Sequence, residues 1–107
     1  KRRMNLREYQ ELAARLALPT ALNDQYLSLV LAGEAGEVAS LFAKAVRDSG
    51  NQVNRDSLKK ELGDVLWFVA VLAEHHHMDM QDVAIANINK LRSRQQRGVL
   101  GGSGDER

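Results

Sequence analysis

The chain contains no cysteine among its 107 residues. Disulfide bonds, thiolate metal sites and a cysteine nucleophile are therefore excluded, and any metal must be held by oxygen or imidazole nitrogen. The sequence also has a single proline, and aromatic residues make up only 5% of it. Its long stretches of Ala, Leu, Glu, Lys and Arg lack the alternation of a strand and so predict an all-α domain.

Strong net charge and long apolar runs are missing as well. The formal net charge is +1, which argues against a protein built mainly to coat nucleic acid or an anionic membrane. The longest apolar run, residues 65–73, is far shorter than the roughly 20 residues that cross a bilayer. The basic start, residues 1–4, precedes polar residues rather than an apolar stretch, unlike a secretory signal. These features together predict a cytoplasmic protein.

Hydrophobic periodicity and capping residues predict four helices within one domain, residues 1–97, at about residues 5–17, 23–48, 54–76 and 79–96. Because residues 65–73 are apolar on every side of the third helix, its far side must also be covered. We therefore expect a four-helix bundle-type subunit that oligomerises through its long apolar helices, as a dimer or a tetramer. The glycine-rich residues 98–107 are expected to form a flexible tail. Arg97 and Arg107 could let this tail close over a phosphate as a lid.

Four carboxylates interrupt the otherwise apolar stripes of the second and third predicted helices. Glu34 and Glu37 form one pair, and Glu61 and Asp64 form the other. Each pair has i,i+3 spacing, which places both side chains on one face of a helix. The turn after Ser49 makes the two helices antiparallel, so the four carboxylates can oppose one another. Since isolated charge on a buried face is costly, the pattern predicts a cage for a hard cation, Mg²⁺ or Mn²⁺ rather than Zn²⁺.

Two short motifs carry these carboxylates. Residues 33–38 read Gly-Glu-Ala-Gly-Glu-Val, and residues 60–66 read Lys-Glu-Leu-Gly-Asp-Val-Leu. Together they resemble the E-x-x-E and E-x-x-D signature of the MazG-like nucleoside triphosphate pyrophosphohydrolases, and the resemblance extends over residues 29–97. Many members carry a second glutamate just before the first motif glutamate, where this chain has Gly33.

The resemblance implies an all-α oligomer that hydrolyses a nucleoside triphosphate to the monophosphate and pyrophosphate. It also implies magnesium ions held by Glu34, Glu37, Glu61 and Asp64. The metal would bridge these carboxylates and the phosphates, which otherwise repel each other. A motif glutamate that the metal does not fully engage, Glu34 or Glu37, would accept a proton from the attacking water. The base and sugar of the nucleotide stay open.

Further residues are candidates for binding the substrate. In the fourth helix, Asn87, Lys90 and Arg94 are similar to family positions that contact the nucleotide and its phosphates. Lys44 lies two turns beyond Glu37 and could stabilise charge on the leaving pyrophosphate. Phe68 lies on the carboxylate stripe and could form the wall of a base pocket. The alternatives are an ordinary solvated cationic face for the basic residues and core packing for Phe68.

Two other functions fit the same pattern. One is a non-catalytic helical oligomerisation or regulatory module whose acidic stripe holds a structural cation or a basic partner. The other is a related enzyme, a phosphoribosyl-ATP pyrophosphohydrolase. The three consecutive histidines, residues 75–77, point in different directions on a helix and cannot easily share one ion, so we interpret them as cations or polar caps near a helix end.

Overall fold

The computed structural model describes residues 3–106, and within this range all regular secondary structure is helical, without strands. The basic start of the chain lies partly, and Arg107 wholly, outside the described residues. The helices are α1 (Leu6–Arg15), α2 (Asp24–Asp48), α3 (Arg55–His75) and α4 (Met80–Gln96), with a short 3₁₀ turn, η1 (Pro19–Ala21), between α1 and α2. The prediction of an all-α chain with four helices is confirmed.

Each α-helix begins directly after an asparagine or aspartate that caps it. The capping side chains are Asn5, Asn23, Asn54 and Asp79, and each accepts a hydrogen bond from a backbone N–H in the first turn. Such caps satisfy amide groups that have no partner inside the helix, typically stabilising it by about 1 kcal/mol. The capping residue just before each helix therefore determines where the helix starts.

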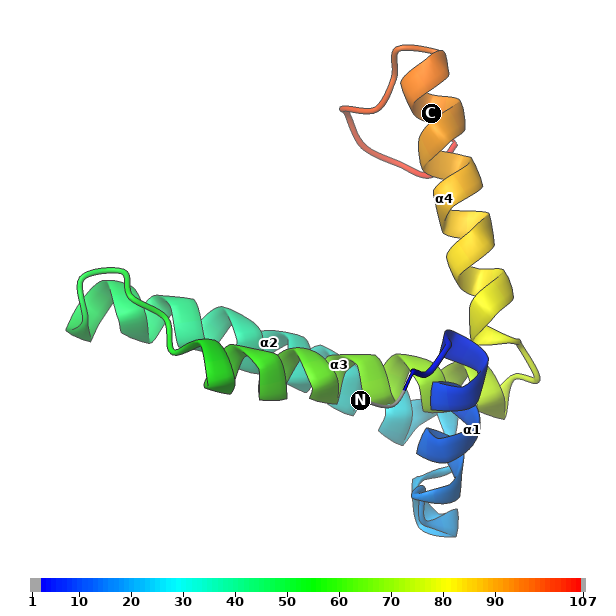
Figure 1. Cartoon of the computed structure of the whole chain (residues 1–107), viewed down its shortest axis with the longest axis horizontal. Coiled ribbons are helices and arrows are strands. Elements are labelled where there is room, and N and C mark those ends of the chain that lie inside the picture. Colours follow the sequence, from blue (N-terminus) through cyan, green and yellow to red (C-terminus); the bar gives the residue numbers. More distant parts are fainter. Residues whose placement is uncertain (1–2, 107) are drawn as a thin grey trace.

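Helices α2 and α3 form a long antiparallel hairpin, the main structural unit of the chain (Figure 1). The loop that joins them turns through two residues with positive φ, Gly50 at 60° and Asn51 at 71°. Glycine and asparagine are the residues that adopt this left-handed conformation most readily. This turn brings the acidic motif of α2 alongside the acidic motif of α3.

The hydrophobic core lies at the open end of the hairpin, where α1 packs across it. Its buried members are Ala13, Leu27, Ala70, Val71 and Met80. Partly buried aromatic side chains, among them those of Trp67 and Phe68, pack against this cluster. The core therefore combines all four helices at one end and leaves the rest of the hairpin with a single layer of packing.

Helix α1 also determines where α4 begins. The amide of Gln10, which is only 3% exposed, donates to the carbonyl of Met78 and accepts from the backbone N–H of Met80, both at 2.8 Å. Arg7 pairs with Asp79, the capping residue of α4, with an Nη2–Oδ2 distance of 2.6 Å. These contacts fix the turn between α3 and α4.

From this turn α4 projects away from the hairpin instead of packing along it (Figure 1). The radius of gyration is 16.5 Å, compared with about 13 Å for a compact domain of roughly this length. The four helices therefore do not close into a bundle within one chain. No helix in the part of the chain that the structure describes is long and apolar enough to cross a membrane.

Candidate functional site

Three of the four predicted carboxylates converge between α2 and α3. Glu34, Glu61 and Asp64 each offer a carboxylate oxygen, and these oxygens lie within 4.8 Å of one another. Glu34 and Glu61 are half-buried, whereas Asp64 is exposed. Among residues 3–106 this acidic triad is the one group of three or more acidic or histidine residues close enough to share an ion. Three of the four carboxylates of the two motifs therefore lie close together in the hairpin, as the sequence predicted.

The electrostatics of the triad centre on Glu34. Partial desolvation raises the pKa of Glu34, and the negative charges of Asp64, Glu61 and Glu37 raise this pKa further. Like charges held close together disfavour ionisation, and a bound cation would reverse that effect. Glu34 is therefore the carboxylate on which the charge of the other three acts together.

Glu37, the fourth motif residue, lies outside the triad. It is exposed, one turn beyond Glu34 on α2, and near enough to act on the charge of Glu34. The structure therefore separates the two glutamates of the first motif, which the sequence could not distinguish. Glu34 provides one of the three converging oxygens, whereas Glu37 lies beside the triad.

The donor set of the triad suits a hard divalent cation. All three groups offer carboxylate oxygen, the ligand type that Mg²⁺ and Mn²⁺ prefer. Octahedral coordination at about 2.0–2.1 Å brings neighbouring ligand oxygens to about 3 Å from one another. The triad oxygens, within 4.8 Å of one another, need only a small side-chain adjustment to reach that spacing. The residues present therefore fit the metal that the motifs imply.

Tyr9 of α1 is a neighbour of the site that sequence analysis missed. Desolvation raises the pKa of its phenol, and the nearby carboxylate of Asp64 adds to the increase. In the sequence Tyr9 is one of several apolar positions on the face of α1, so its pattern predicts core packing alone. Only the crossing of α1 over α3 brings the phenol within range of the charge of Asp64.

Phe68 lies one turn beyond Asp64, within a small aromatic cluster. Its ring meets Trp67 edge-on at a centroid distance of 4.9 Å and lies 6.5 Å from the ring of Tyr26. Phe68 also packs against the hydrophobic core. Tyr26 is 45% exposed, so the cluster has one face that a flat ligand could reach. The base-pocket role of Phe68 stays a prediction.

The predicted basic and polar substrate residues do not reach the triad within one chain. Lys44 is exposed near the far end of α2, where its charge acts on Asp48. Asn87, Lys90 and Arg94 lie between the middle and the C-terminal end of α4, which stands away from the hairpin (Figure 1). Lys90 and Arg94 instead contact Asp105. Their roles in substrate binding stay predictions.

The histidines at the end of α3 form a polar contact with the start of α2. His76 Nε2 lies 2.7 Å from Asp24 Oδ1, and His75 Nε2 lies 3.7 Å from the same oxygen. His77 adopts a φ of 57° and ends the helix. This arrangement fits their interpretation as polar groups near a helix terminus.

Comparison with known proteins identifies the class. The model of the MazG nucleotide pyrophosphohydrolase domain matches residues 23–99, which contain α2, α3, α4 and the acidic triad. The chain therefore belongs to the MazG nucleotide pyrophosphohydrolase family, and the family assignment made from the two motifs is confirmed. No solved structure matches the chain significantly.

Individual relatives add detail. The chain is similar to the Gene 37 protein of Mycobacterium phage L5, with 48% identity over 85 residues, covering 77% of this chain and 75% of the phage protein. It is also similar to dCTP pyrophosphatase 1 of Mus musculus and of Rattus norvegicus, each with 37% identity over 73 residues. Those matches cover 64% of this chain but only 43% of either rodent protein.

Proposed function

We propose that the chain is a magnesium-dependent nucleoside triphosphate pyrophosphohydrolase that converts a (deoxy)nucleoside triphosphate to the monophosphate and pyrophosphate. The observation that carries the proposal is the convergence of Glu34, Glu61 and Asp64 on the hairpin of a MazG-family chain. A role in clearing unwanted nucleotides from the cytoplasmic pool is the biological setting that we propose. The names of the rodent relatives make dCTP the first substrate to test.

In this proposal the acidic triad holds the metal. When bound, a divalent cation supplies positive charge that lets a polyanion approach carboxylates and makes a nearby water more acidic. Mn²⁺ is the expected substitute because it accepts the same oxygen ligands. Partial desolvation and the negative charges of Asp64, Glu61 and Glu37 raise the pKa of Glu34. Both effects would be offset by a bound cation, which supports the assignment.

Glu37 is our preferred general base. Its exposed position beside the triad leaves its carboxylate available to take a proton from the water that attacks phosphorus. The oxygen of this water bonds to the α-phosphorus. The bond from this phosphorus to the oxygen that bridges it to the β-phosphate breaks, and pyrophosphate leaves. Glu34, by contrast, provides one of the three converging oxygens, so we assign it to the metal. The sequence alone did not distinguish the two glutamates as the base.

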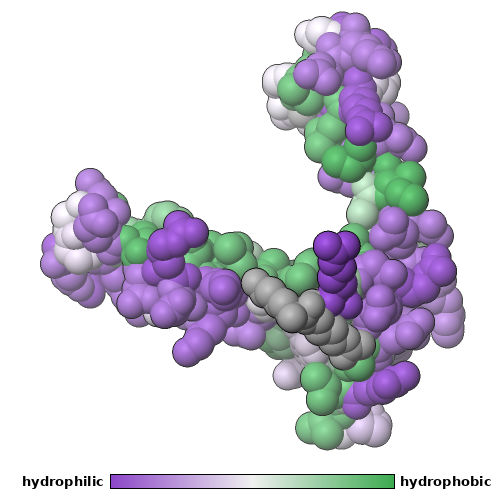
Figure 2. All heavy atoms as spheres, in the orientation of Figure 1, coloured by the Kyte–Doolittle hydropathy of each residue, from purple (hydrophilic) through white to green (hydrophobic). Residues whose placement is uncertain are grey.

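We further propose that the chain works as a homo-oligomer, with the apolar faces of its helices forming the contact. Large hydrophobic side chains are exposed on three helices, and Figure 2 shows hydrophobic surface both on α4 and along the hairpin. The most exposed examples on these helices are Leu29 and Val46 of α2, Leu62 of α3, and Ile85 and Ile88 of α4. Apolar surface of this extent is typical of protein interfaces.

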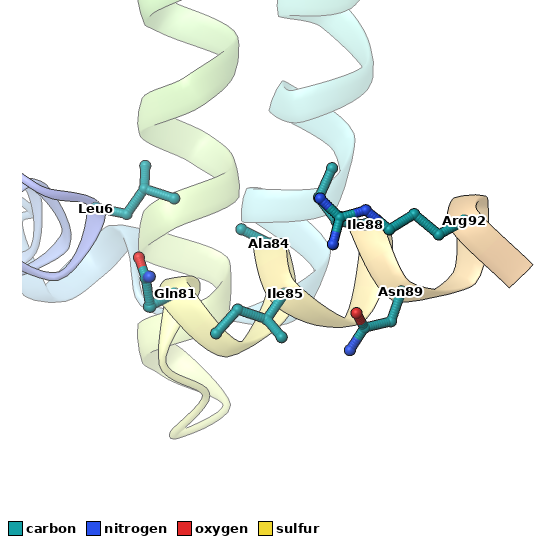
Figure 3. Close-up of a pocket in the computed structure, with 7 residues that line it drawn as sticks. All are labelled: Leu6, Gln81, Ala84, Ile85, Ile88, Asn89 and Arg92. Atoms are coloured by element: carbon teal, nitrogen blue, oxygen red, sulfur yellow. The ribbon is translucent and has the colours of Figure 1, made fainter.

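The start of α4 offers one such surface at close range. Leu6 of α1 and Ile85 and Ile88 of α4 surround an open pocket of about 330 Å³ (Figure 3). Arg92 and two amide side chains complete its rim. Within one chain, Lys90 and Arg94 of α4 do not reach the triad. A second copy that covers this face could bring these residues of one chain towards the triad of the other.

A nucleotide panel with separated products tests the function. The chain would be mixed with Mg²⁺ and dCTP, the other common triphosphates and phosphoribosyl-ATP, and pyrophosphate would be measured separately from orthophosphate. Release of pyrophosphate with a nucleoside monophosphate supports the proposal. Release of orthophosphate alone, or no turnover of any triphosphate, contradicts it. Turnover of phosphoribosyl-ATP alone would move the chain to the related enzyme class.

A further inference from the structure

The backbone reverses direction immediately after α4. The N–H of Val99 donates to the carbonyl of Arg94 at 2.8 Å, and the N–H of Gly98 donates to the carbonyl of Gln95 at 3.2 Å. Together with the φ of 72° at Gly98, these two bonds form a Schellman motif. The motif directs residues 98–106, here called the return segment, back along the helix that they have just left (Figure 1).

The return segment places an acid on two predicted phosphate-binding cations. Asp105 Oδ1 accepts hydrogen bonds from Lys90 Nζ and from a terminal nitrogen of Arg94, both at 3.1 Å. The same guanidinium nitrogen of Arg94 donates to the carbonyl of Gly104 at 3.3 Å. Hydrogen bonds from Lys90 and Arg94 hold the pKa of Asp105 below its usual value. The carboxylate is therefore ionised and acts as an anion bound by its own chain.

Arg94 is one of two buried residues of α4, the other being Met80 at the start of the helix. The side chain of Arg94 is 5% exposed, whereas that of Asp105 is 80% exposed. The Nε of Arg94 is buried and has no hydrogen-bond partner among the described residues. A buried charged donor without a partner is costly. Lys90 and Arg94 therefore form a cationic pair with donor capacity that one aspartate oxygen does not use.

Lys90 and Arg94, two of the predicted substrate-binding residues, form a cationic seat for a phosphate group, and we propose that Asp105 occupies this seat as an internal competitor. A polyphosphate offers the same kind of acceptor oxygen with more negative charge, which suits a guanidinium and an ammonium together. Binding of the triphosphate or of pyrophosphate at this seat then requires Asp105 to leave. The inference rests on the proposed function for the identity of the anion, and on the contacts of Asp105 for its geometry.

The contact is suited to being displaced. The Asp105 side chain is exposed, so solvent screens its ion pairs, and such pairs are only modestly stable. Residues 98–104 include four glycines, three of them at positive φ, so this linker can release Asp105 without breaking any helix. Competition of this kind lowers the apparent affinity for the anion by the fraction of chains in which the seat is filled.

Titration of the full chain with inorganic pyrophosphate in the absence of divalent metal tests the proposal. The variant Asp105→Asn keeps the size of the side chain and removes its charge. Calorimetry should show that it binds pyrophosphate about three to ten times more tightly than the unmodified chain, because the competitor is gone. Lys90→Ala should weaken binding by a similar factor, because the seat loses one of its two cations.

Glu106→Gln is the matched control, since it removes the neighbouring exposed acid. Binding by this variant should stay within about twofold of that by the unmodified chain. NMR of the backbone amides of the three positive-φ glycines in the return segment, Gly98, Gly102 and Gly104, gives a second measurement. Pyrophosphate should shift these signals in the unmodified chain towards their positions in Asp105→Asn.

Three results would overturn the proposal. Unchanged pyrophosphate affinity in Asp105→Asn would show that the contact of Asp105 only holds the return segment against α4. Equal tightening in Glu106→Gln would show a general effect of negative charge in place of a specific seat. No pyrophosphate binding by any variant would remove the anion site. These titrations need no turnover, so they are independent of the proposed function. A chain that hydrolyses no triphosphate but gives the expected pyrophosphate affinities would contradict the proposed function and still support the role of Asp105.

Discussion

Glu34 is the residue where the conflict of charges in this chain is greatest. It is half-buried between two helices, and three other carboxylates act on it. Folding therefore holds together groups that repel each other when all are ionised. Such an arrangement reduces stability while no cation is bound, and a ligand that binds only the folded state recovers it. The stability of the chain should accordingly report on the state of this site.

The first prediction concerns Glu34→Gln in metal-free buffer with a chelator. The folded state raises the pKa of Glu34 above its ordinary value of 4.5. The folded chain therefore binds more protons than the unfolded chain between these two pKa values, and stability falls as pH rises through this window. The variant escapes this loss, so its Tm should exceed that of the unmodified chain at about pH 7 but not below about pH 4.

Thermal unfolding followed by circular dichroism across this pH range measures the effect. Addition of Mg²⁺ should then raise the Tm of the unmodified chain more than that of the variant, because the variant has lost a ligand. A Tm difference that stays constant with pH would show that the charge of Glu34 does not cause the effect.

The second prediction separates Glu37 from the triad. If Glu37 accepts the proton of the attacking water, Glu37→Gln should lower kcat by about 10²–10⁴-fold. The Mg²⁺ concentration that gives half-maximal activity should stay nearly unchanged, because the triad keeps its three ligands. Steady-state kinetics at several Mg²⁺ concentrations distinguish these effects. A large rise in the Mg²⁺ requirement would place Glu37 among the metal ligands instead.

At the level of the elements, sequence patterns predicted what depends on neighbours along the chain. Asn23, Asn54 and Asp79 lie at the predicted starts of three helices, and their side chains cap these helices. The i,i+3 spacing of the acids, together with one antiparallel turn, accounts for the triad. These features need only helical phase and a cap, both of which are local.

Long-range contacts were not predictable in the same way. The direction of α4 depends on Gln10, whose amide reaches a turn 68 to 70 residues later in the chain. The approach of Tyr9 to Asp64 depends on how α1 crosses α3. Nothing in the periodicity of α1 distinguishes a glutamine that braces a turn from one that faces solvent. The sequence therefore predicted the convergence of the carboxylates, for three of the four, better than the position of α4, the helix expected to carry further substrate-binding residues.

The third prediction tests this brace. Gln10→Ala leaves the carbonyl of Met78 and the N–H of Met80 without the partner that they have in the buried turn. Such a loss costs about 1–3 kcal/mol for each group left unsatisfied. Urea unfolding should therefore show a lower free energy of unfolding, whereas Gln25→Ala, on the exposed surface of α2, should change it by less than about 0.5 kcal/mol. Equal losses in both variants would contradict the role of Gln10.

At the scale of the whole molecule, the open shape is the main feature. The hairpin and α4 diverge, and apolar side chains are exposed on both (Figures 1 and 2). A chain of this size that leaves so much apolar surface uncovered is expected to bury it against another copy. The same association would complete the bundle that one chain leaves unfinished.

The fourth prediction follows from this shape. Light scattering after size exclusion should give the mass of a dimer or a larger oligomer for the unmodified chain. Ile88→Glu places a charge on the exposed apolar face of α4, where Ile88 is 45% exposed, and should lower that mass. Gln95→Glu adds the same charge at an exposed polar position of α4 and should leave it unchanged. A monomer in the unmodified chain would contradict the proposed association.

The most direct test of the account as a whole is magnesium-dependent release of pyrophosphate from dCTP and other triphosphates by the unmodified chain, Glu61→Gln and Glu11→Gln. Glu61 belongs to the triad, whereas Glu11 is an exposed acid on α1. We predict pyrophosphate release by the unmodified chain and Glu11→Gln, and loss of at least about 10²-fold in Glu61→Gln while its helical content is retained. Full activity in Glu61→Gln would contradict the assignment of the acidic triad as the catalytic metal site.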